Sequence, residues 1–225
     1  MALAKLHIPD GFISLPTSAL FGVISIFFIA IALRGAAKTL DDRTTPLAGL
    51  TAVFVFAAQM INFPVAAGTS GHLVGAALAT VLVGPYSATL ALTVVLGVQA
   101  LLFADGGLSA FGLNVFNLAI VAVWLSHFIF ITLKRILPKT KVALSAAAAI
   151  AAYISVPVAA LGFSLQYAIG GTGTISAATV ATAMIGTHLL IGIGESLITF
   201  FAVTAVITSR SDLVYGWKPK LEIRS

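Results

Sequence analysis

The stretch "TSALFGVISIFFIAIALR", residues 17–34, decides the class of fold to which this chain belongs. Nearly all of its side chains are apolar, and the run ends at one basic residue, Arg34. An α-helix rises about 1.5 Å per residue, so a helix of this length is about as long as the roughly 30 Å hydrocarbon core of a bilayer is thick. The stretch therefore predicts a transmembrane helix.

The composition of the whole chain agrees with a membrane protein. Of the 225 residues, 60% are hydrophobic and 8% are charged, and the mean hydropathy is +1.11. A soluble domain carries about 25% charged residues. The formal charge of +5 lies in short loops, which is typical of membrane orientation and not of nucleic-acid binding. The absence of cysteine excludes disulfides and thiolate metal sites.

Further apolar runs predict the other spans of one all-α, polytopic domain that covers residues 1–225. The candidate spans are 17–36, 46–63, 86–103, 111–133, 142–165 and 176–208. A shorter apolar segment, 72–83, is separated from the next run by Gly84-Pro85. This segment fits either a thin crossing or the returning arm of a re-entrant loop.

Basic residues indicate the orientation of the chain. They gather in Arg34–Arg43, in Lys134–Lys141 and in the tail 209–225, and such loops face the cytoplasm. Seven crossings, with 72–83 counted as one, place all three regions on that side, whereas six crossings do not. We therefore expect about seven transmembrane helices, with the N-terminus outside and the C-terminus in the cytoplasm.

The loops that this orientation places outside hold the most distinctive polar residues of the chain. Polar groups at membrane depth cost free energy unless they pair or face a cavity. Several of them on one side predict an outward-facing site. The residues are His7, Asp10, Asn62, Ser70, His72, Asp105, Asn114, Asn117 and Gln166.

Two motifs contain most of this set. In "MINFPVAAGTSGHLVGAALA", residues 60–79, Pro64 and a glycine-rich turn precede His72. Such irregular backbone fits either a packed interhelical hairpin or a site that water or protein satisfies. In "FADGGLSAFGLNVFNLAI", residues 103–120, Asn114 and Asn117 lie on one helical face. They either form interhelical hydrogen bonds or orient imidazole ligands.

A third motif, "GTHLLIGIGESLITF" at 186–200, places His188 and Glu195 seven residues apart on one helical face. An acid inside a span is a candidate functional residue. A buried structural pair and a gating role both fit this spacing as well as metal ligation does. His127, in the middle of 111–133, is expected to be a packing or hydrogen-bonding residue.

Four motifs, "HIPDGF", "GTSGHLVG", "DGGLSAFGLNVFN" and "HLLIGIGES", resemble the substrate-binding components of cobalt and nickel energy-coupling-factor transporters, the CbiM/NikM type. The resemblance runs from residue 7 to about residue 205. It implies a subunit of the prokaryotic cytoplasmic membrane that captures Ni²⁺ or Co²⁺ on the outer side, with a link to cobalamin biosynthesis. It also implies a transmembrane coupling subunit, two cytoplasmic ABC-type ATPases and, in some systems, a small accessory membrane subunit. The chain itself is expected not to be an enzyme, since no GxxxxGK[ST] phosphate loop is present.

The resemblance also implies the site, within an N-terminal segment at 7–16 and the loops around it. In the family, a free N-terminal amine, the amide nitrogen and imidazole of the following histidine, and a second imidazole hold the ion. By motif the two imidazoles belong to His7 and His72, and nitrogen donors of this kind suit Ni²⁺. The residues that would brace these ligands are Asp10, Asn62, Ser70, Asp105, Asn114 and Asn117.

The chain departs from the family pattern before His7. Five residues precede Leu6, so the amine of Met1 is not adjacent to His7. Three alternatives follow: cleavage before Leu6, a different start, or a rebuilt site in which other groups replace the amine.

Two other functions use the same residues. In a rhomboid-like intramembrane protease, Ser70 would be the nucleophile and His188 the base. In a stand-alone proton-coupled metal transporter, Glu195 and His188 would form a relay. The protease alternative accounts neither for "HIPDGF" nor for the asparagine-rich motif, and a proton-coupled carrier usually has more than one acid in its spans.

Overall fold

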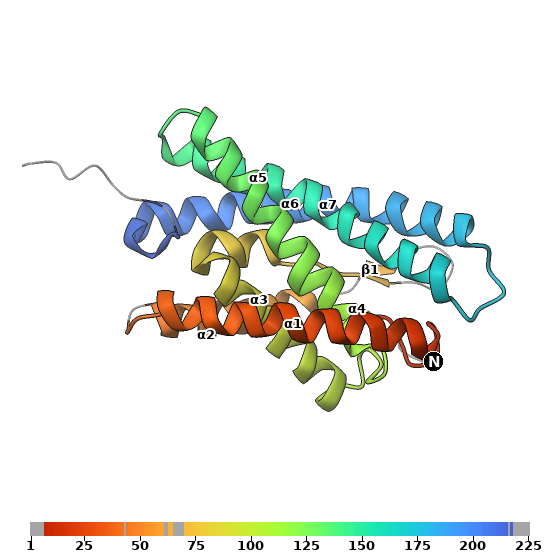
Figure 1. Ribbon diagram of the computed structural model, residues 1–225. Coiled ribbons are helices and arrows are strands. Elements are labelled where there is room, and N and C mark those ends of the chain that lie inside the picture. Colours follow the sequence, from red (N-terminus) through yellow and green to blue (C-terminus); the bar gives the residue numbers. More distant parts are fainter. Residues whose placement is uncertain (1–6, 43, 61–62, 65–69, 216, 218–225) are drawn as a thin grey trace, which may run out of the picture.

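The computed structural model describes residues 7–42, 44–60, 63–64, 70–215 and 217, with the backbone alone at 63–64 and 70–71. Helices make up almost all of it (Figure 1). They are α1 (Leu15–Thr39), α2 (Thr44–Gln59), α3 (Ala76–Leu102), α4 (Phe111–Asn114), η2 (Val115–Val121), α5 (Ala122–Ile136), α6 (Lys141–Gly170), α7 (Ala177–Ser209) and η3 (Ser211–Leu213). Two short strands, β1 (Phe63–Pro64) and β2 (Ser70–Gly71), pair antiparallel.

The predicted all-α membrane fold is confirmed in its main features. Five apolar helical stretches are long enough to cross a bilayer, namely α1, α3, Phe111–Ile136, α6 and α7, while α2 is shorter. The stretch Phe111–Ile136 contains α4, the π-helical turn η2 and α5 without interruption. Two helices begin at side-chain caps, where Thr140 accepts from the amide of Ala143 and Ser176 accepts from that of Thr179.

The break that the sequence predicts at Gly84-Pro85 is present inside α3. Gly84 has φ +78° and ψ 166°, and a Cβ there would lie 2.8 Å from the ring of Tyr215. Residues just before and just after α3, His72 and Asp105, both contact His7. A straight helix of this length would hold its ends about 40 Å apart. The helix is therefore two antiparallel arms, 76–83 and 85–102, that fold back at Gly84.

The first of these arms is shorter than the predicted segment 72–83. Residues 72–75 are not helical, and the helix begins only at Ala76. Gly75, with φ +75°, ends this extended piece, and a Cβ there would lie 2.9 Å from the side chain of Val55. We call residues 72–75 the His72 strap.

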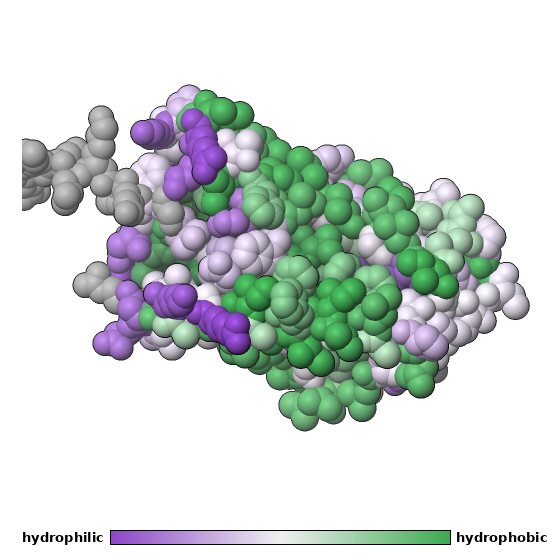
Figure 2. All heavy atoms as spheres, in the orientation of Figure 1, coloured by the Kyte–Doolittle hydropathy of each residue, from purple (hydrophilic) through white to green (hydrophobic). Residues whose placement is uncertain are grey.

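The hydrophilic surface gathers at one end of the molecule. Figure 2 shows it on the left, where Figure 1 places the loop after α1, the loop between α5 and α6, and the C-terminal end. Contacts agree with this grouping, because two of these segments meet the same turn of α3 at Gly84. Gly35, near the end of α1, lies against the ring of Tyr86, and the amide of Tyr215, after η3, donates to the carbonyl of Leu82. The described parts of the three basic regions thus share one end, and the segment that carries His7 lies against Gly107, Asn114 and Gly170, away from that end.

Candidate metal site

His7 is buried at the end of the bundle that lies opposite the basic regions. The segment that carries it crosses the ends of several helices. Its Ile8 carbonyl accepts from the amide of Gly107 at 2.9 Å, and the amide of Ser14 donates to Gly170 at 2.6 Å. These main-chain contacts leave His7 only 6% exposed.

His72 approaches His7 from the His72 strap. It is 7% exposed, and its Nδ1 lies 2.8 Å from the carbonyl oxygen of Leu73. This bond requires the proton on Nδ1, so the lone pair of the neutral ring is on Nε2. Burial and the neighbouring His7 lower the pKa of His72 to about 3. The ring is therefore neutral and available as a ligand at physiological pH.

The two imidazoles form the centre of the candidate site. Their ring centroids are 4.6 Å apart and their planes are tilted by 52°. Nδ1 of His7 lies 3.3 Å from Oδ2 of Asp105 without the alignment of a hydrogen bond, so we treat this contact as electrostatic. Nε2 of His7 is buried and has no hydrogen-bond partner among the described residues. A buried nitrogen of this kind is an atom that a bound cation would satisfy.

The described side chains do not complete a metal site. No group of three histidines or acidic residues that could hold an ion occurs within the described ranges. Two imidazoles thus come together, as the resemblance implied. Further donors would have to come from the main chain, from water or from residues outside those ranges.

Asn114 holds the residue next to His7 from both sides. Its Oδ1 accepts from the amide of Ile8 at 3.1 Å, and its Nδ2 donates to the carbonyl of Ile8 at 3.3 Å. Asn114 is at the end of α4 and is buried. Its position therefore fixes the backbone that delivers His7.

The loop 105–109 fits closely under the same segment. Oδ1 of Asp10 accepts from the amide and from the hydroxyl of Ser109, both at 2.7 Å. Gly106 has φ +94°, and a Cβ there would lie 3.0 Å from Cβ of His7. At Gly107 a Cβ would collide with the backbone of Asp10. The glycine pair of this motif thus permits the close approach that the site needs.

The remaining predicted residues lie elsewhere or outside the described part. Asn117 exchanges hydrogen bonds with Gln166 at 2.8 and 3.2 Å, so it joins η2 to α6. Asn62 and the side chain of Ser70 lie outside the described residues. His188 is half-buried, and its Nδ1 lies 2.7 Å from the carbonyl of Met184 in its own helix, but it is near enough to His72 to contribute to the lowering of the His72 pKa.

Glu195 is the buried acid of α7, and it does not pair with His188. Its Oε2 accepts from the amide of Val74 at 2.6 Å, and its Oε1 accepts from that of Gly75 at 2.9 Å. His188 and Glu195 thus share a helical face, but their described hydrogen bonds go to different main-chain groups.

Two glutamines outside the four motifs support the His72 strap. Nε2 of Gln59 donates to the carbonyl of Val74 at 2.9 Å, and Nε2 of Gln99 donates to Oε1 of Gln59 at 3.0 Å. Both glutamines are fully buried. Their positions inside apolar runs could have identified them, because an amide at membrane depth needs a partner.

Comparison with known proteins decides the family. The sequence model of the CbiM family, described as the cobalt uptake substrate-specific transmembrane region, matches residues 7–213. The chain belongs to the CbiM family. The resemblance inferred from the four motifs is confirmed, and this CbiM chain is a multi-pass protein of the prokaryotic cell membrane.

Two relatives and one solved structure match the CbiM chain over most of its length. A protein of Haloquadratum walsbyi, named as a candidate metal transport protein, is 39% identical over 93% of this chain and 94% of its own. A fused nickel transport protein NikMN of Archaeoglobus fulgidus, also a candidate by its name, is 38% identical over 93% of this chain and 68% of its own. The crystal structure of a truncated transition metal transporter has a TM-score of 0.82 and 29% identity, over 91% of this chain and 99% of its own. All three are named as transport proteins, which favours a transport component over the protease alternative.

Proposed function

We propose that this CbiM-family chain captures Ni²⁺ or Co²⁺ as the substrate-binding subunit of an ATP-driven energy-coupling-factor importer. The observation that carries the proposal is the buried pair formed by His7 and His72, with ring centroids 4.6 Å apart. Imidazole is a good ligand for both metals, and nitrogen donors in a square-planar or tetragonal arrangement suit Ni²⁺.

The surroundings of the pair support metal binding. Asp105 lies beside His7, and Asn114 fixes the backbone next to it. Carboxylates and carbonyls that orient imidazoles raise their quality as ligands. The donor that replaces the family's N-terminal amine depends on residues 1–6, so cleavage before Leu6, a different start and a rebuilt site remain the three alternatives.

The proposed topology has seven passages, with the metal site outside. The two arms of α3 supply two of the passages, and α2 supplies one despite its 16 residues. The described parts of the basic regions share one end, which the positive-inside rule assigns to the cytoplasm. His7 and His72 then face the outer side.

The proposed partners are a transmembrane coupling subunit, two cytoplasmic ABC-type ATPases and, in some systems, a small accessory membrane subunit. The nickel relative supports joint action with another component, because its name describes a fusion and this chain matches 68% of its length. Uptake against a gradient would then need the partners, whereas metal binding would not.

Metal binding tests the proposal directly. Four proteins are purified in detergent: the full chain, His7→Ala, His72→Ala and the control His127→Ala. Each is equilibrated with equal concentrations of Ni²⁺, Co²⁺, Zn²⁺ and Cu²⁺, and the metal bound per chain is measured by mass spectrometry. His127 is half-buried and contacts Tyr215, near the opposite end. We expect one Ni²⁺ or Co²⁺ per chain, lost in the first two variants and kept in the control. Absence of specific Ni²⁺ or Co²⁺ binding by the unaltered chain would refute the proposal.

A further inference from the structure

We infer that Glu195, assisted by Gln59, is a positioning residue that sets the orientation and the tautomer of the His72 imidazole through the Leu73–Val74 peptide. The inference rests on the proposed function, because it assigns His72 as a metal ligand. It gives a buried acid in a membrane-spanning helix a defined role at a site built by other elements.

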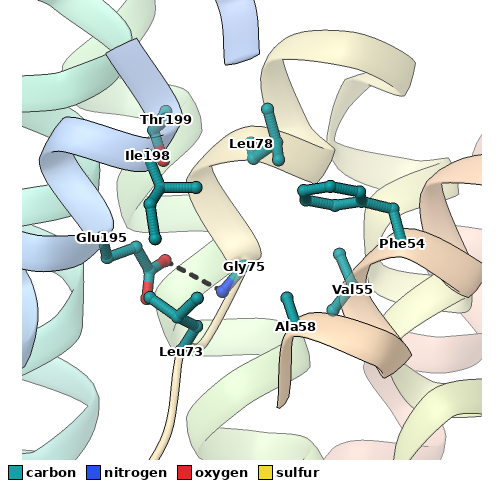
Figure 3. A pocket seen from close by; sticks show the side chains of 9 residues that line it. All are labelled: Phe54, Val55, Ala58, Leu73, Gly75, Leu78, Glu195, Ile198 and Thr199. Atoms are coloured by element: carbon teal, nitrogen blue, oxygen red, sulfur yellow. Dashed lines mark hydrogen bonds between the residues drawn. The ribbon is translucent and has the colours of Figure 1, made fainter. Parts of the chain in front are cut away.

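Glu195 contacts the His72 strap through both of its carboxylate oxygens. Each carboxylate oxygen accepts one main-chain N–H, from Val74 at 2.6 Å and from Gly75 at 2.9 Å. Figure 3 shows the carboxylate directed from α7 at the backbone of Gly75. Glu195 is 2% exposed. Hydrogen bonds to a carboxylate are about twice as strong as neutral ones, and burial strengthens them further.

One peptide unit connects this carboxylate to the imidazole. The N–H of Val74 and the carbonyl of Leu73 belong to the same planar peptide. Glu195 takes the N–H, and Nδ1 of His72 donates to the carbonyl. A peptide whose N–H is bonded to a carboxylate is polarised, so its carbonyl is a better acceptor. The chain of bonds therefore holds the proton on Nδ1 and leaves Nε2 as the nitrogen that can bind a metal.

Gln59 holds the next peptide from the opposite side. Its amide donates to the carbonyl of Val74 and in turn accepts from Gln99 in the second arm of α3. The carbonyl of Gly75 accepts from the amide of Ala79, within the first arm. The main-chain polar groups from the carbonyl of Leu73 to that of Gly75 are thus all bonded. Three helices, α2, α3 and α7, thus hold the main chain of the His72 strap.

The surroundings of Glu195 favour this role. The small pocket beside the carboxylate is lined by Phe54, Val55, Ala58, Leu73, Gly75, Leu78, Ile198 and Thr199 (Figure 3). These side chains are apolar except that of Thr199, so they supply little that could substitute for the strap amides. A simpler role exists, in which Glu195 only stabilises the start of the first arm of α3 through the helix dipole. The experiment must separate the two roles.

Glu195→Gln separates them, with Thr199→Val as the matched control. The glutamine keeps the size of the side chain, but an NH2 group, which can only donate, replaces one of the two oxygens that accept from the strap amides. Thr199 is buried one helical turn further along α7 and lines the same pocket. We measure the Ni²⁺ affinity by competition, the visible absorption spectrum of bound Ni²⁺, and the thermal midpoint without metal.

We expect Glu195→Gln to bind Ni²⁺ ten- to a hundredfold more weakly, with a shifted spectrum, as for other residues that orient metal ligands. Thr199→Val is expected to keep the spectrum and to change the affinity less than threefold. A lowered thermal midpoint with unchanged affinity and spectrum would overturn the inference. If Glu195→Gln does not fold, Gln59→Met takes its place with the same readouts and the same criterion.

Failure of the inference and failure of the proposed function give different results. If the unaltered chain binds no Ni²⁺ or Co²⁺, the proposed function fails. If the unaltered chain binds and His72→Ala does not, while Glu195→Gln matches the unaltered chain, only the inference fails.

Discussion

Replacing Asn114 by alanine is expected to weaken metal binding without disturbing the helices. The substitution removes both hydrogen bonds to Ile8. The carbonyl of Ile8 keeps its bond from Gly107, so the amide of Ile8 is the group left without its partner. A buried polar group that loses its partner costs about 1–3 kcal/mol, and the second, longer bond adds about 0.5 kcal/mol.

A total of about 1.5–3.5 kcal/mol corresponds to a roughly 12- to 300-fold change in an equilibrium constant. The lost free energy weakens the docking of residues 7–14 onto the bundle, because Asn114 belongs to α4 and its two lost bonds joined α4 to that segment. The apparent metal affinity is proportional to the fraction of molecules in which His7 is docked, so it falls when that fraction falls. A segment held by a few main-chain bonds opens more easily than the helical core. We therefore expect at least a tenfold loss of Ni²⁺ or Co²⁺ affinity.

Asn117→Ala is the control, since the same residue type three positions later bonds Gln166 and not Ile8. Affinity is measured by competition titration in detergent, and the helical core is followed by thermal unfolding. Asn114→Ala should lose affinity and keep most of its thermal midpoint, whereas Asn117→Ala should show the reverse. Equal affinities in Asn114→Ala and the unaltered chain would refute the argument that Ile8 docking controls the site.

Three further predictions concern the backbone and pH. Gly107→Ala should lower metal affinity, because its Cβ would collide with Asp10; competition titration measures this, and an unaltered affinity would contradict it. Gly84→Ala should lower the free energy of unfolding by about 1–3 kcal/mol, because φ is +78° and the ring of Tyr215 fills the space. A lower thermal midpoint would show this loss, and an unchanged midpoint would contradict it. The pKa of His72 is about 3, below its ordinary 6.5, so the unfolded chain binds more protons between these values. Stability without metal should therefore fall as pH drops from about 6.5 toward 3, and His72→Gln should show a weaker fall in thermal unfolding.

The sequence predicted the helices well because apolar length alone decides them. The runs 17–36, 111–133, 142–165 and 176–208 all lie within helices of the structure, with boundary differences of a few residues. Gly84-Pro85 predicted the break in α3 for a physical reason, the positive φ that glycine tolerates. The folding back of the two arms was not predictable from that break, because the angle depends on what packs around it, here Tyr215.

The candidate site was predictable only in part. The approach of His7 to His72 followed from the resemblance and not from spacing, since the two lie in separate segments. The partner of Glu195 could not be predicted from the sequence, because helical spacing gives the face on which a residue lies and not what packs on that face. The asparagines illustrate the same limit: Asn114 and Asn117 share a face, yet one bonds Ile8 and the other Gln166.

The docking of the N-terminal segment has a consequence for biogenesis. The amide of Ser14 donates to Gly170, and the amide of Thr172 donates to Phe12. Phe12 and Ser14 therefore rest on the end of α6 and the start of the loop after it, which leave the ribosome late in synthesis. A nascent chain that ends after α5 can place residues 8–10 on Gly107, Ser109 and Asn114, but it lacks the partners of Phe12 and Ser14. The docking of the N-terminal segment is therefore completed only after α6 and the loop that follows it have been made.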